Sequence, residues 1–308
     1  MKRRTKRETP ILLRISMIVF IVLLAVYISL RIYISRSEHN RLKREKIDFT
    51  IFVTHNVSYP IKLSQGERDP AETKKDGYNY DKYPSRRKGY GLLVELCGIG
   101  CYRAENKYSD FIDFTRAAKN LRYDAVAVDL SRNMDYFLKL IESGYSHIPF
   151  TSANIIDSNG GAIFRRWIIK EIKGENPETG EIAEVKTGIF SVAFDEEDSD
   201  YTTVRTYKTI NPKIASLEAA TKMKNEMCDL IIALSHVSSE KSMDLARSVP
   251  GIDLVINLSE PDTPTRLRSA GNSYIFDIPE GSSSLQKLNI KLDQSSFDVL
   301  LSRQREMR

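Results

Sequence analysis

The longest apolar run of the chain lies near its start, at residues 11–34 (ILLRISMIVFIVLLAVYISLRIYI). Two arginines and two serines are the interruptions in its 24 residues. A helix rises about 1.5 Å per residue, so this run can span the roughly 30 Å hydrocarbon core of a bilayer. We therefore predict a transmembrane anchor. A cleaved signal peptide is the alternative, but its apolar region usually has about 7 to 15 residues, and no small-x-small cleavage site follows this run.

From residue 48 onward, short runs rich in β-branched and aromatic residues alternate with segments whose apolar residues recur every three or four positions. This alternation predicts sheets covered by helices, and so an α/β fold. We expect 162–172 and 181–194 to pair as antiparallel strands across a turn. The other predicted strands are 48–57, 91–97, 125–130, 147–156, 229–236, 253–258, 273–279 and 285–293.

Helices are predicted around residues 111–121 and 134–143, from Asn211 onward, and around 243–249. Asn211 and Pro212 are typical of a helix start. The spacing of apolar residues after them predicts that the buried face of this helix consists of Ile214, Leu217, Ala220, Met223 and Met227.

The pattern divides the chain into five segments. They are a basic tail at 1–10, the anchor at 11–34, a charged stalk at 35–47, one large domain at 48–293 and a C-terminal tail at 294–308. Within the domain, residues 62–89 are polar and rich in turn-forming residues, which indicates a long loop. Tyrosines and arginines in this loop are candidates for binding a partner or an anionic polymer or lipid, although a solvated insertion is the alternative: Tyr78, Tyr80, Tyr83, Arg86 and Arg87.

The formal net charge of +5 is small for 308 residues. Basic residues gather on both sides of the apolar run, within 2–7 and 36–46. This placement suits lipid headgroups better than a nucleic acid, so we expect a membrane partner and no nucleic acid. Three cysteines, an odd number, do not describe a disulfide framework. Cys97 and Cys101 either pair outside the cytoplasm or remain two small buried thiols.

Four stretches of the domain resemble a known family. They are Tyr123-Asp124-Ala125-Val126, then residues 149–155 (PFTSANI), 230–236 (LIIALSH) and 249–256 (VPGIDLVI). In this order they resemble the amino-terminal metallophosphoesterase domain of the 5'-nucleotidase and UDP-sugar hydrolase family, which is calcineurin-like. The resemblance covers roughly residues 48–293. It implies a four-layer α-β-β-α sandwich that carries two metal ions in loops at strand ends.

Most of the family's metal-ligand positions hold other residues in this chain. Its Asp-x-His motif corresponds to Asn56 and Ser58, and its later His-x-His motif corresponds to Ser259 and Pro261. His236 alone matches a ligand position with the expected residue. Two metals need carboxylate, imidazole and amide donors that converge on one cleft, so these replacements remove much of the resembled centre.

The remaining two motifs are also altered. The family's Gly-Asp site falls near Cys97 and Gly98, and its Asn-His-Glu site corresponds to Leu130, Ser131 and Arg132. Ser131 and Arg132 thus occupy catalytic positions of the family, but a serine is a poor acid at neutral pH and an arginine repels a dication. Glu95 is near the second site, but its direction depends on the register of its strand.

These replacements favour a membrane-anchored, inactive interaction module with no cofactor, which binds a protein partner or a second copy of itself. Because the resembled enzymes act outside the cytoplasm, we expect a cytoplasmic N-terminus and an extracytoplasmic domain. The alternative is a divergent hydrolase that uses one divalent cation such as magnesium or calcium. Its oxygen ligands would be Asp129, Glu260 and Asp262.

Overall fold

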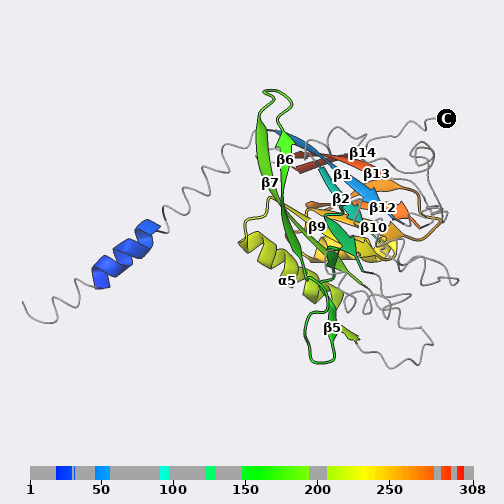
Figure 1. Ribbon diagram of the computed structural model, residues 1–308, viewed down its shortest axis with the longest axis horizontal. Coiled ribbons are helices and arrows are strands. Elements are labelled where there is room, and N and C mark those ends of the chain that lie inside the picture. The colour runs from blue at the N-terminus through cyan, green and yellow to red at the C-terminus, as the bar shows by residue number, and fades with distance from the viewer. Residues whose placement is uncertain are drawn as a thin grey trace, which may run out of the picture.

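The computed structural model describes a mixed α/β domain and a short helix near the start of the chain (Figure 1). The described residues are 19–29, 31, 46–55, 91–96, 122–128, 148–193, 207–280, 286–292 and 297–301. The strands among them are β1 (Ile47–Thr54), β2 (Gly91–Glu95), β3 (Ala125–Ala127), β4 (Phe150–Thr151), β5 (Ile155–Asp157), β6 (Ile168–Glu175), β7 (Ile182–Val192), β8 (Tyr207–Thr209), β9 (Leu230–His236), β10 (Leu254–Ser259), β11 (Arg266–Ala270), β12 (Ser273–Pro279), β13 (Gln286–Leu292) and β14 (Phe297–Leu301). The helices of the domain within these described ranges are α5 (Pro212–Asn225) and α6 (Ser239–Ser248).

Most of the strands form one mixed sheet in the order β11-β12-β10-β9-β7-β6-β1-β2-β3-β4, and β13 joins it by pairing with β1 and β14. The β6 and β7 strands pair in an antiparallel register, which confirms the pair predicted for 162–172 and 181–194. Because β6 is antiparallel to both β1 and β7, the strands on its two sides run in the same direction. The carboxyl ends of β1, β2, β3, β4, β7, β9, β10 and β12 therefore meet at one edge of the sheet, the carboxyl edge.

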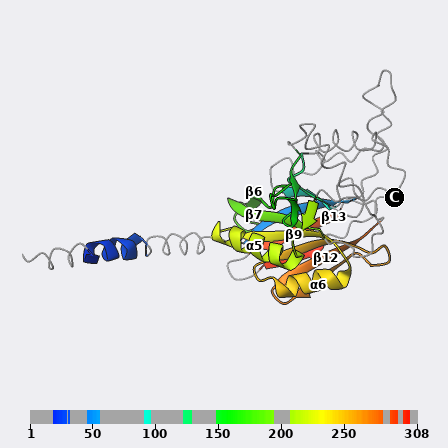
Figure 2. The same ribbon diagram turned by 90° about the horizontal axis from the view of Figure 1, so that it is seen from below.

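Alternate side chains of the strands fill two cores. The central core joins Ile51 and Val94 of one half of the sheet with Ile232 and Ile256 of the other half, so the two halves pack face to face. The helix-side core contains the opposite faces of β7, β9, β10 and β12, together with α5 and α6. Figure 2 shows both helices on the same side of these strands. The helices predicted at 111–121 and 134–143 lie outside the described residues.

Helix α5 begins where the sequence predicts, because the side chain of Asn211 accepts hydrogen bonds from the first turn. Its predicted buried face is wrong in part. Ala220 and Met223 are buried, but Ile214 is 63% exposed, and Leu217 and Met227 are also exposed. The helix instead buries small residues: Ala215, Ser216, Ala219 and Ala220, with Met223.

Gly188 of β7 makes room for Met223 on the buried face of α5. A Cβ atom at Gly188 would lie 2.3 Å from the Sδ atom of Met223, so helix and strand approach closely. Alanine and serine permit this approach, whereas isoleucine and leucine would hold the helix farther out. The helix therefore turns its small residues toward the sheet and leaves Ile214 and Leu217 exposed.

Further differences from the predicted elements lie along the chain, and one of them is β8, which was not predicted. The run 147–156 is not one strand but two, β4 in the main sheet and β5, which pairs with β8 in a separate two-stranded sheet. The edge strand β11 was not predicted, because its polar residues lack a period-two apolar pattern. The range 294–308, which the sequence pattern assigns to a tail, contains β14, and this strand pairs with β13.

The N-terminal run is described in part. Residues 19–29 are helical. Within the described residues, no helix combines the length and the apolar character that a membrane crossing requires. The other residues of the predicted anchor, and nearly all of the stalk, lie outside the described residues, so the anchor stays a prediction.

Candidate functional site

The carboxyl edge brings together polar residues from both halves of the sheet. Thr54 ends β1 and is followed by His55, Glu95 ends β2, His236 ends β9 and Ser259 ends β10. Residues at such strand ends form ligand sites in many α/β proteins, because the following loops leave the strands there. The sequence resemblance predicts the candidate site at this edge.

Glu95 points away from the central core. Its neighbours Val94 and Leu96 face that core, so Glu95 lies on the outer face of the sheet. Its carboxylate accepts hydrogen bonds from the hydroxyl groups of Thr54 and Tyr123, the latter at 3.1 Å. The three side chains are buried. This arrangement settles the direction of Glu95, which binds hydroxyl groups beside β1 and is turned away from the space between the two halves of the sheet.

His55 is buried immediately after β1, with 1% of its surface exposed. Burial disfavours the charged imidazolium and lowers the pKa of His55 to about 4. The side chain is therefore neutral at physiological pH. His55 matches none of the resembled ligand positions. Its burial is that of a core residue.

His236, the remnant ligand predicted from the sequence, is a described residue. It ends β9, and because Leu234 faces the central core, the alternation of the strand places His236 on the same face. Its side chain is half-buried. The structure thus places an imidazole at the carboxyl edge, on the face of β9 that turns toward the other half of the sheet.

The end of β10 differs from a metal-ligand site. Ser259 is buried, and its hydroxyl group donates to the backbone oxygen of Ile278 at 3.2 Å. Pro261 offers no side-chain donor atom. Glu260 and Asp262 are both exposed, and a carboxylate oxygen of Glu260 accepts a hydrogen bond from the Thr263 hydroxyl at 3.3 Å.

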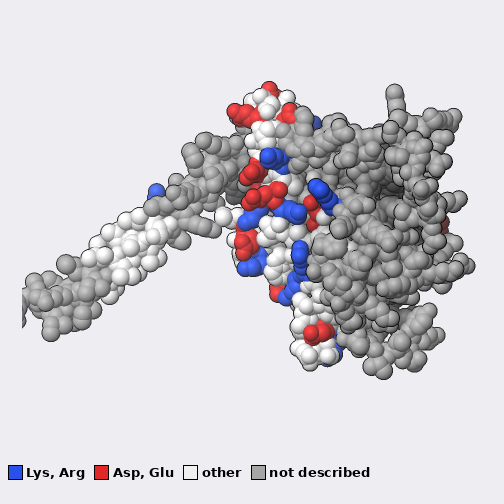
Figure 3. All heavy atoms as spheres, in the orientation of Figure 1, with Lys and Arg blue, Asp and Glu red and all other residues white. Residues whose placement is uncertain are grey.

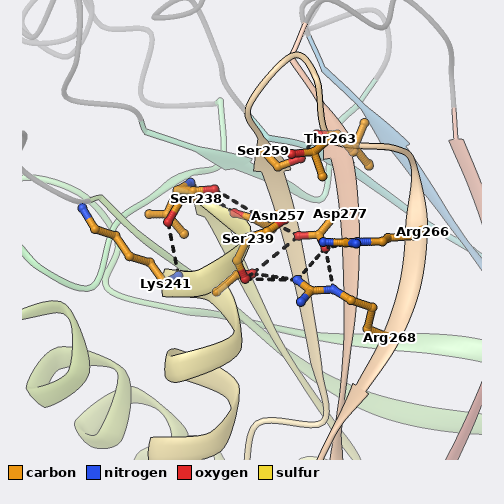
Figure 4. A network of polar contacts seen from close by, with 12 residues as sticks. Ser238, Ser239, Lys241, Asn257, Ser259, Thr263, Arg266, Arg268 and Asp277 are labelled. Carbon is orange, nitrogen blue, oxygen red and sulfur yellow. Dashed lines mark hydrogen bonds and ion pairs between the residues drawn. The ribbon is translucent and has the colours of Figure 1, made fainter.

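Sequence reasoning missed a buried polar cluster beneath the start of α6 (Figure 4). Asn257 lies in the middle of β10, and both the oxygen and the nitrogen of its side-chain amide form hydrogen bonds. The oxygen accepts from Ser235 Oγ at 3.0 Å and Val237 N at 3.1 Å, and the nitrogen donates to Val237 O at 2.9 Å and Asp277 Oδ1 at 3.1 Å. This amide therefore joins three adjacent strands, β9, β10 and β12.

Asp277 completes the cluster with an ion pair. The carboxylate is fully buried, and Arg268 of β11 donates to it from Nε at 2.8 Å and from a terminal nitrogen at 2.6 Å. Arg268 also donates to the backbone oxygen of Ser239 at 3.1 Å, and Arg266 lies 3.4 Å from the same carboxylate. The sequence signal for this cluster is a polar residue inside an otherwise apolar run: Asn257 in DLVINL and Asp277 in SYIFDIP. Its role is to join α6 and the edge strand to the sheet.

Several candidate residues lie outside the described residues, and their arrangement stays a prediction. They are the remnant ligand Asn56, the residues Asp129, Ser131 and Arg132 after β3, and the loop residues Tyr78, Tyr80, Tyr83, Arg86 and Arg87. Of the alternative cation ligands, Glu260 and Asp262 are described, and Asp129 is not.

The described part of the candidate site does not fit a pair of metal ions. In the ranges that the structure describes, no three His, Cys, Asp or Glu side chains form a group that could hold a metal ion. The Ser259 hydroxyl is engaged within the sheet, and Glu95 faces outward. Among the described residues at resembled ligand positions, His236 is the one that offers an imidazole.

Comparison with known proteins finds solved structures that are similar to this domain in fold. No protein-family model matches the sequence, and no curated protein does. The calcineurin-like phosphoesterase YfkN from Bacillus subtilis matches with a TM-score of 0.58 and 19% identity, over 83% of this chain and 89% of that chain. A 5'-nucleotidase precursor from Thermus thermophilus matches with a TM-score of 0.55 and 14% identity, over 82% of this chain. The NAD nucleotidase of Haemophilus influenzae matches with a TM-score of 0.53 and 18% identity, over 84% of this chain.

The fold is that of the calcineurin-like phosphoesterases. The mixed sheet agrees with the α/β fold predicted from the sequence. The full four-layer sandwich stays a prediction, because the helices predicted at 111–121 and 134–143 lie outside the described residues. The chain spans about half the length of two of these structures, 54% of the 5'-nucleotidase precursor and 50% of the NAD nucleotidase. At these identities the likeness establishes the fold, and function has to be argued from the site.

Proposed function

We propose that this protein is a membrane-anchored, catalytically inactive member of the 5'-nucleotidase-like phosphoesterases, which acts as an interaction module. Its domain would lie outside the cytoplasm and bind a protein partner or a second copy of the chain. The carboxyl edge, with His236, is the surface that such a partner or a small ligand would reach.

The observation that carries this proposal is the state of the last resembled ligand motif. Where the family has two histidines, this chain has a buried serine that donates to Ile278 within the sheet and a proline. A neutral hydroxyl group that already donates within the sheet is a poor ligand for a dication, and proline contributes no side-chain ligand. A two-metal centre depends on several ligands at once. Loss of one ligand weakens the binding of both ions and the activation of the water that they bind.

The N-terminal helix supports the anchor. Its large apolar side chains are exposed on all sides, from 45% for Leu24 to 65% for Phe20. Figure 3 draws these residues as an almost uncharged white rod. Exposed apolar surface costs roughly 25 cal/mol per Å² in water, so a helix of this composition is stable in a lipid or protein environment. The length of the whole apolar run favours lipid.

A metal analysis tests the proposal. Full-length protein purified in detergent, incubated with manganese or zinc and desalted, is expected to retain less than one equivalent of metal and to leave a generic phosphate ester intact. The matched variant is His236→Ala, which should change neither result. Two bound equivalents per chain that His236→Ala reduces would refute the loss of the metal centre.

The same measurement tests the single-cation alternative. If Asp129, Glu260 and Asp262 hold one ion, magnesium or calcium is retained at one equivalent, and a Glu260→Gln/Asp262→Asn double variant loses it. A cation-dependent hydrolase activity that disappears in this double variant would replace the proposed function by the alternative.

A further inference from the structure

The hairpin formed by β6 and β7 packs against the place where the chain enters the domain. Lys46, the residue before β1, has its Nζ atom 2.7 Å from Oε1 of Glu178 at the hairpin turn. Glu175, the last residue of β6, pairs with Asp48 of β1. In Figure 1 the hairpin projects from the domain beside the start of β1. Hairpin and chain entrance thus form one contact region.

Gly174 makes this contact close. A Cβ atom at this position would lie 2.0 Å from Cγ2 of Ile47 and 3.4 Å from the backbone oxygen of Asp48. Ile47 is only 2% exposed, although it begins the first strand, and on its other side it pairs with Leu292 of β13. The first residue of β1 is therefore held between two strands, and it is not free to fray as chain ends usually do.

The turn of the hairpin is held by its own hydrogen bonds. The side-chain oxygen of Asn176 accepts from the backbone nitrogens of Glu178 at 2.8 Å and Thr179 at 3.2 Å. The Gly180 nitrogen donates to the Asn176 backbone oxygen at 2.8 Å, and Gly180 has a φ of +72°, a conformation that favours glycine. This turn fixes the backbone at Glu178, whose carboxylate pairs with Lys46.

We propose that the β6–β7 hairpin is a strap that fixes where the stalk leaves the domain, and so turns the carboxyl edge away from the membrane. This inference rests on the proposed membrane anchor. The stalk joins the domain at the amino end of β1, next to the strap. The carboxyl edge lies at the other end of the eight residues of β1, about 26 Å away at roughly 3.3 Å per residue.

The orientation defines the kind of partner. A carboxyl edge that faces water is reached by a soluble protein or a soluble ligand and not by a lipid headgroup of the same membrane. The strap side bears exposed acidic residues, among them Glu178 and Glu181, and charged side chains are costly to bury in the hydrocarbon core. The strap is therefore suited to hold the stalk and not to insert into lipid.

Energy transfer to a membrane dye tests the orientation. The three native cysteines are replaced by serine in the full-length chain, and one new cysteine is placed at the strap (Thr179→Cys) or at the carboxyl edge (Glu260→Cys). Each labelled protein is reconstituted into phosphatidylcholine vesicles that carry an acceptor dye on their headgroups. Transfer is expected to be clearly stronger from position 179 than from position 260.

The outcomes separate this inference from the proposed function. Protein that floats with the vesicles but shows equal transfer from both positions, or stronger transfer from position 260, overturns the orientation and leaves the anchor intact. Protein that does not float with the vesicles overturns the anchor, and the orientation falls with it.

Limited proteolysis tests the strap itself, without any membrane. Trypsin cleavage after Lys46 is followed by mass spectrometry. Glu178→Lys is expected to accelerate this cleavage about two- to fivefold, the range of a surface ion pair, and the control Glu181→Lys is expected to leave it unchanged. Gly174→Val should accelerate it at least about tenfold, because the new side chain displaces Ile47. Equal cleavage in Glu178→Lys, Glu181→Lys and the unchanged protein would show that the hairpin does not hold the stalk.

Discussion

Asp253 binds Ile231 by two hydrogen bonds at the amino ends of neighbouring strands. Its side-chain oxygen accepts from the Ile231 nitrogen at 2.7 Å, and its own backbone nitrogen donates to the Ile231 oxygen at 3.0 Å. The residue stands directly before β10 and thereby fixes the register of β10 against β9. Register decides which side chains reach the carboxyl edge, so this distant contact helps to position the candidate site.

The same pair of bonds recurs before two other parallel strands. Asp124, before β3, accepts from the Leu93 nitrogen at 2.9 Å and donates to its oxygen at 2.8 Å. Asp229, before β9, accepts from the Lys186 nitrogen at 2.9 Å and donates to its oxygen at 2.7 Å. An aspartate ahead of a buried apolar run is thus a signature of strand alignment in this chain.

Replacement of Asp253 by asparagine is expected to change the pH dependence of stability. Burial raises the pKa of Asp253 from 3.8 to about 6, although the hydrogen bond from Ile231 and the charge of Lys224 oppose this. Between these pH values the folded chain binds more protons than the unfolded chain, so this group makes the unfolding free energy fall as the pH rises from about 4 to about 6. Asparagine keeps the acceptor oxygen without the charge. The difference in unfolding free energy between the unchanged protein and Asp253→Asn should therefore change by on the order of 2 to 3 kcal/mol between pH 4 and pH 6.

Urea denaturation at several pH values measures this difference. His55 acts in the opposite sense, because its lowered pKa, about 4, makes the folded chain lose stability as the pH falls from about 6.5. His55 is present in both proteins, so its contribution cancels when the two curves are subtracted. A difference that stays constant between pH 4 and pH 6 would contradict the prediction.

Removal of Arg268 is expected to destabilise the domain strongly. Arg268→Met leaves the carboxylate of Asp277 fully buried, with Arg266 as a more distant partner at 3.4 Å. An uncompensated buried charge costs about 3 to 5 kcal/mol, and the remaining arginine should keep the loss near the lower value. Addition of Asp277→Asn to this variant should recover at least half of the loss, since asparagine needs no counter-charge.

Chemical denaturation of the single and double variants measures these changes. The control is Arg247→Met, which alters an exposed arginine of α6 and should stay within about 0.5 kcal/mol of the unchanged protein. If the double variant is as unstable as Arg268→Met alone, the arginine stabilises the domain by packing and not by its charge.

Much of the sheet could be predicted from sequence, because buried strands here are apolar runs bounded by turn residues. The runs that contain Ile232 and Ile256 are examples. The face of α5 could not be predicted, because apolar spacing weighs Ile214 above Ala215, while the close approach of β7 selects the smaller side chain. That approach depends on Gly188, which is distant in the sequence.

For the candidate site, the sequence predicts which strand ends carry polar residues, but not how these residues are paired. The motif residues His236 and Ser259 end neighbouring parallel strands and so lie at one edge of the sheet. The direction of Glu95 and the ion pair of Asp277 depend on strand register and on the edge strand β11, and a single sequence fixes neither. The hydrogen-bond partners of these buried polar residues lie on other strands, so the pairs can be identified only when the alignment of the strands is known.

Gly188→Val is expected to displace α5 from the sheet. The valine side chain would meet Met223, where even a Cβ atom would lie 2.3 Å from Sδ and 3.1 Å from the Met223 Cβ. Overpacking of this kind costs typically about 1 to 3 kcal/mol. The control on the same interface is Ser216→Ala. The buried Ser216 hydroxyl has no hydrogen-bond partner among the described residues, so its removal should leave stability unchanged or improve it. A larger loss in Ser216→Ala than in Gly188→Val would contradict this description of the interface.

Substitutions on the two faces of α5 test which face is buried. Ile214→Lys and Leu217→Lys alter exposed side chains and should change the unfolding free energy by less than about 0.5 kcal/mol. Ala219→Leu places a larger side chain against the sheet and should lower stability by about 1 to 3 kcal/mol. Thermal unfolding followed by circular dichroism distinguishes the two results. If the lysine variants are the unstable ones, then α5 buries the face that apolar spacing predicts, and the small-residue interface described here is wrong.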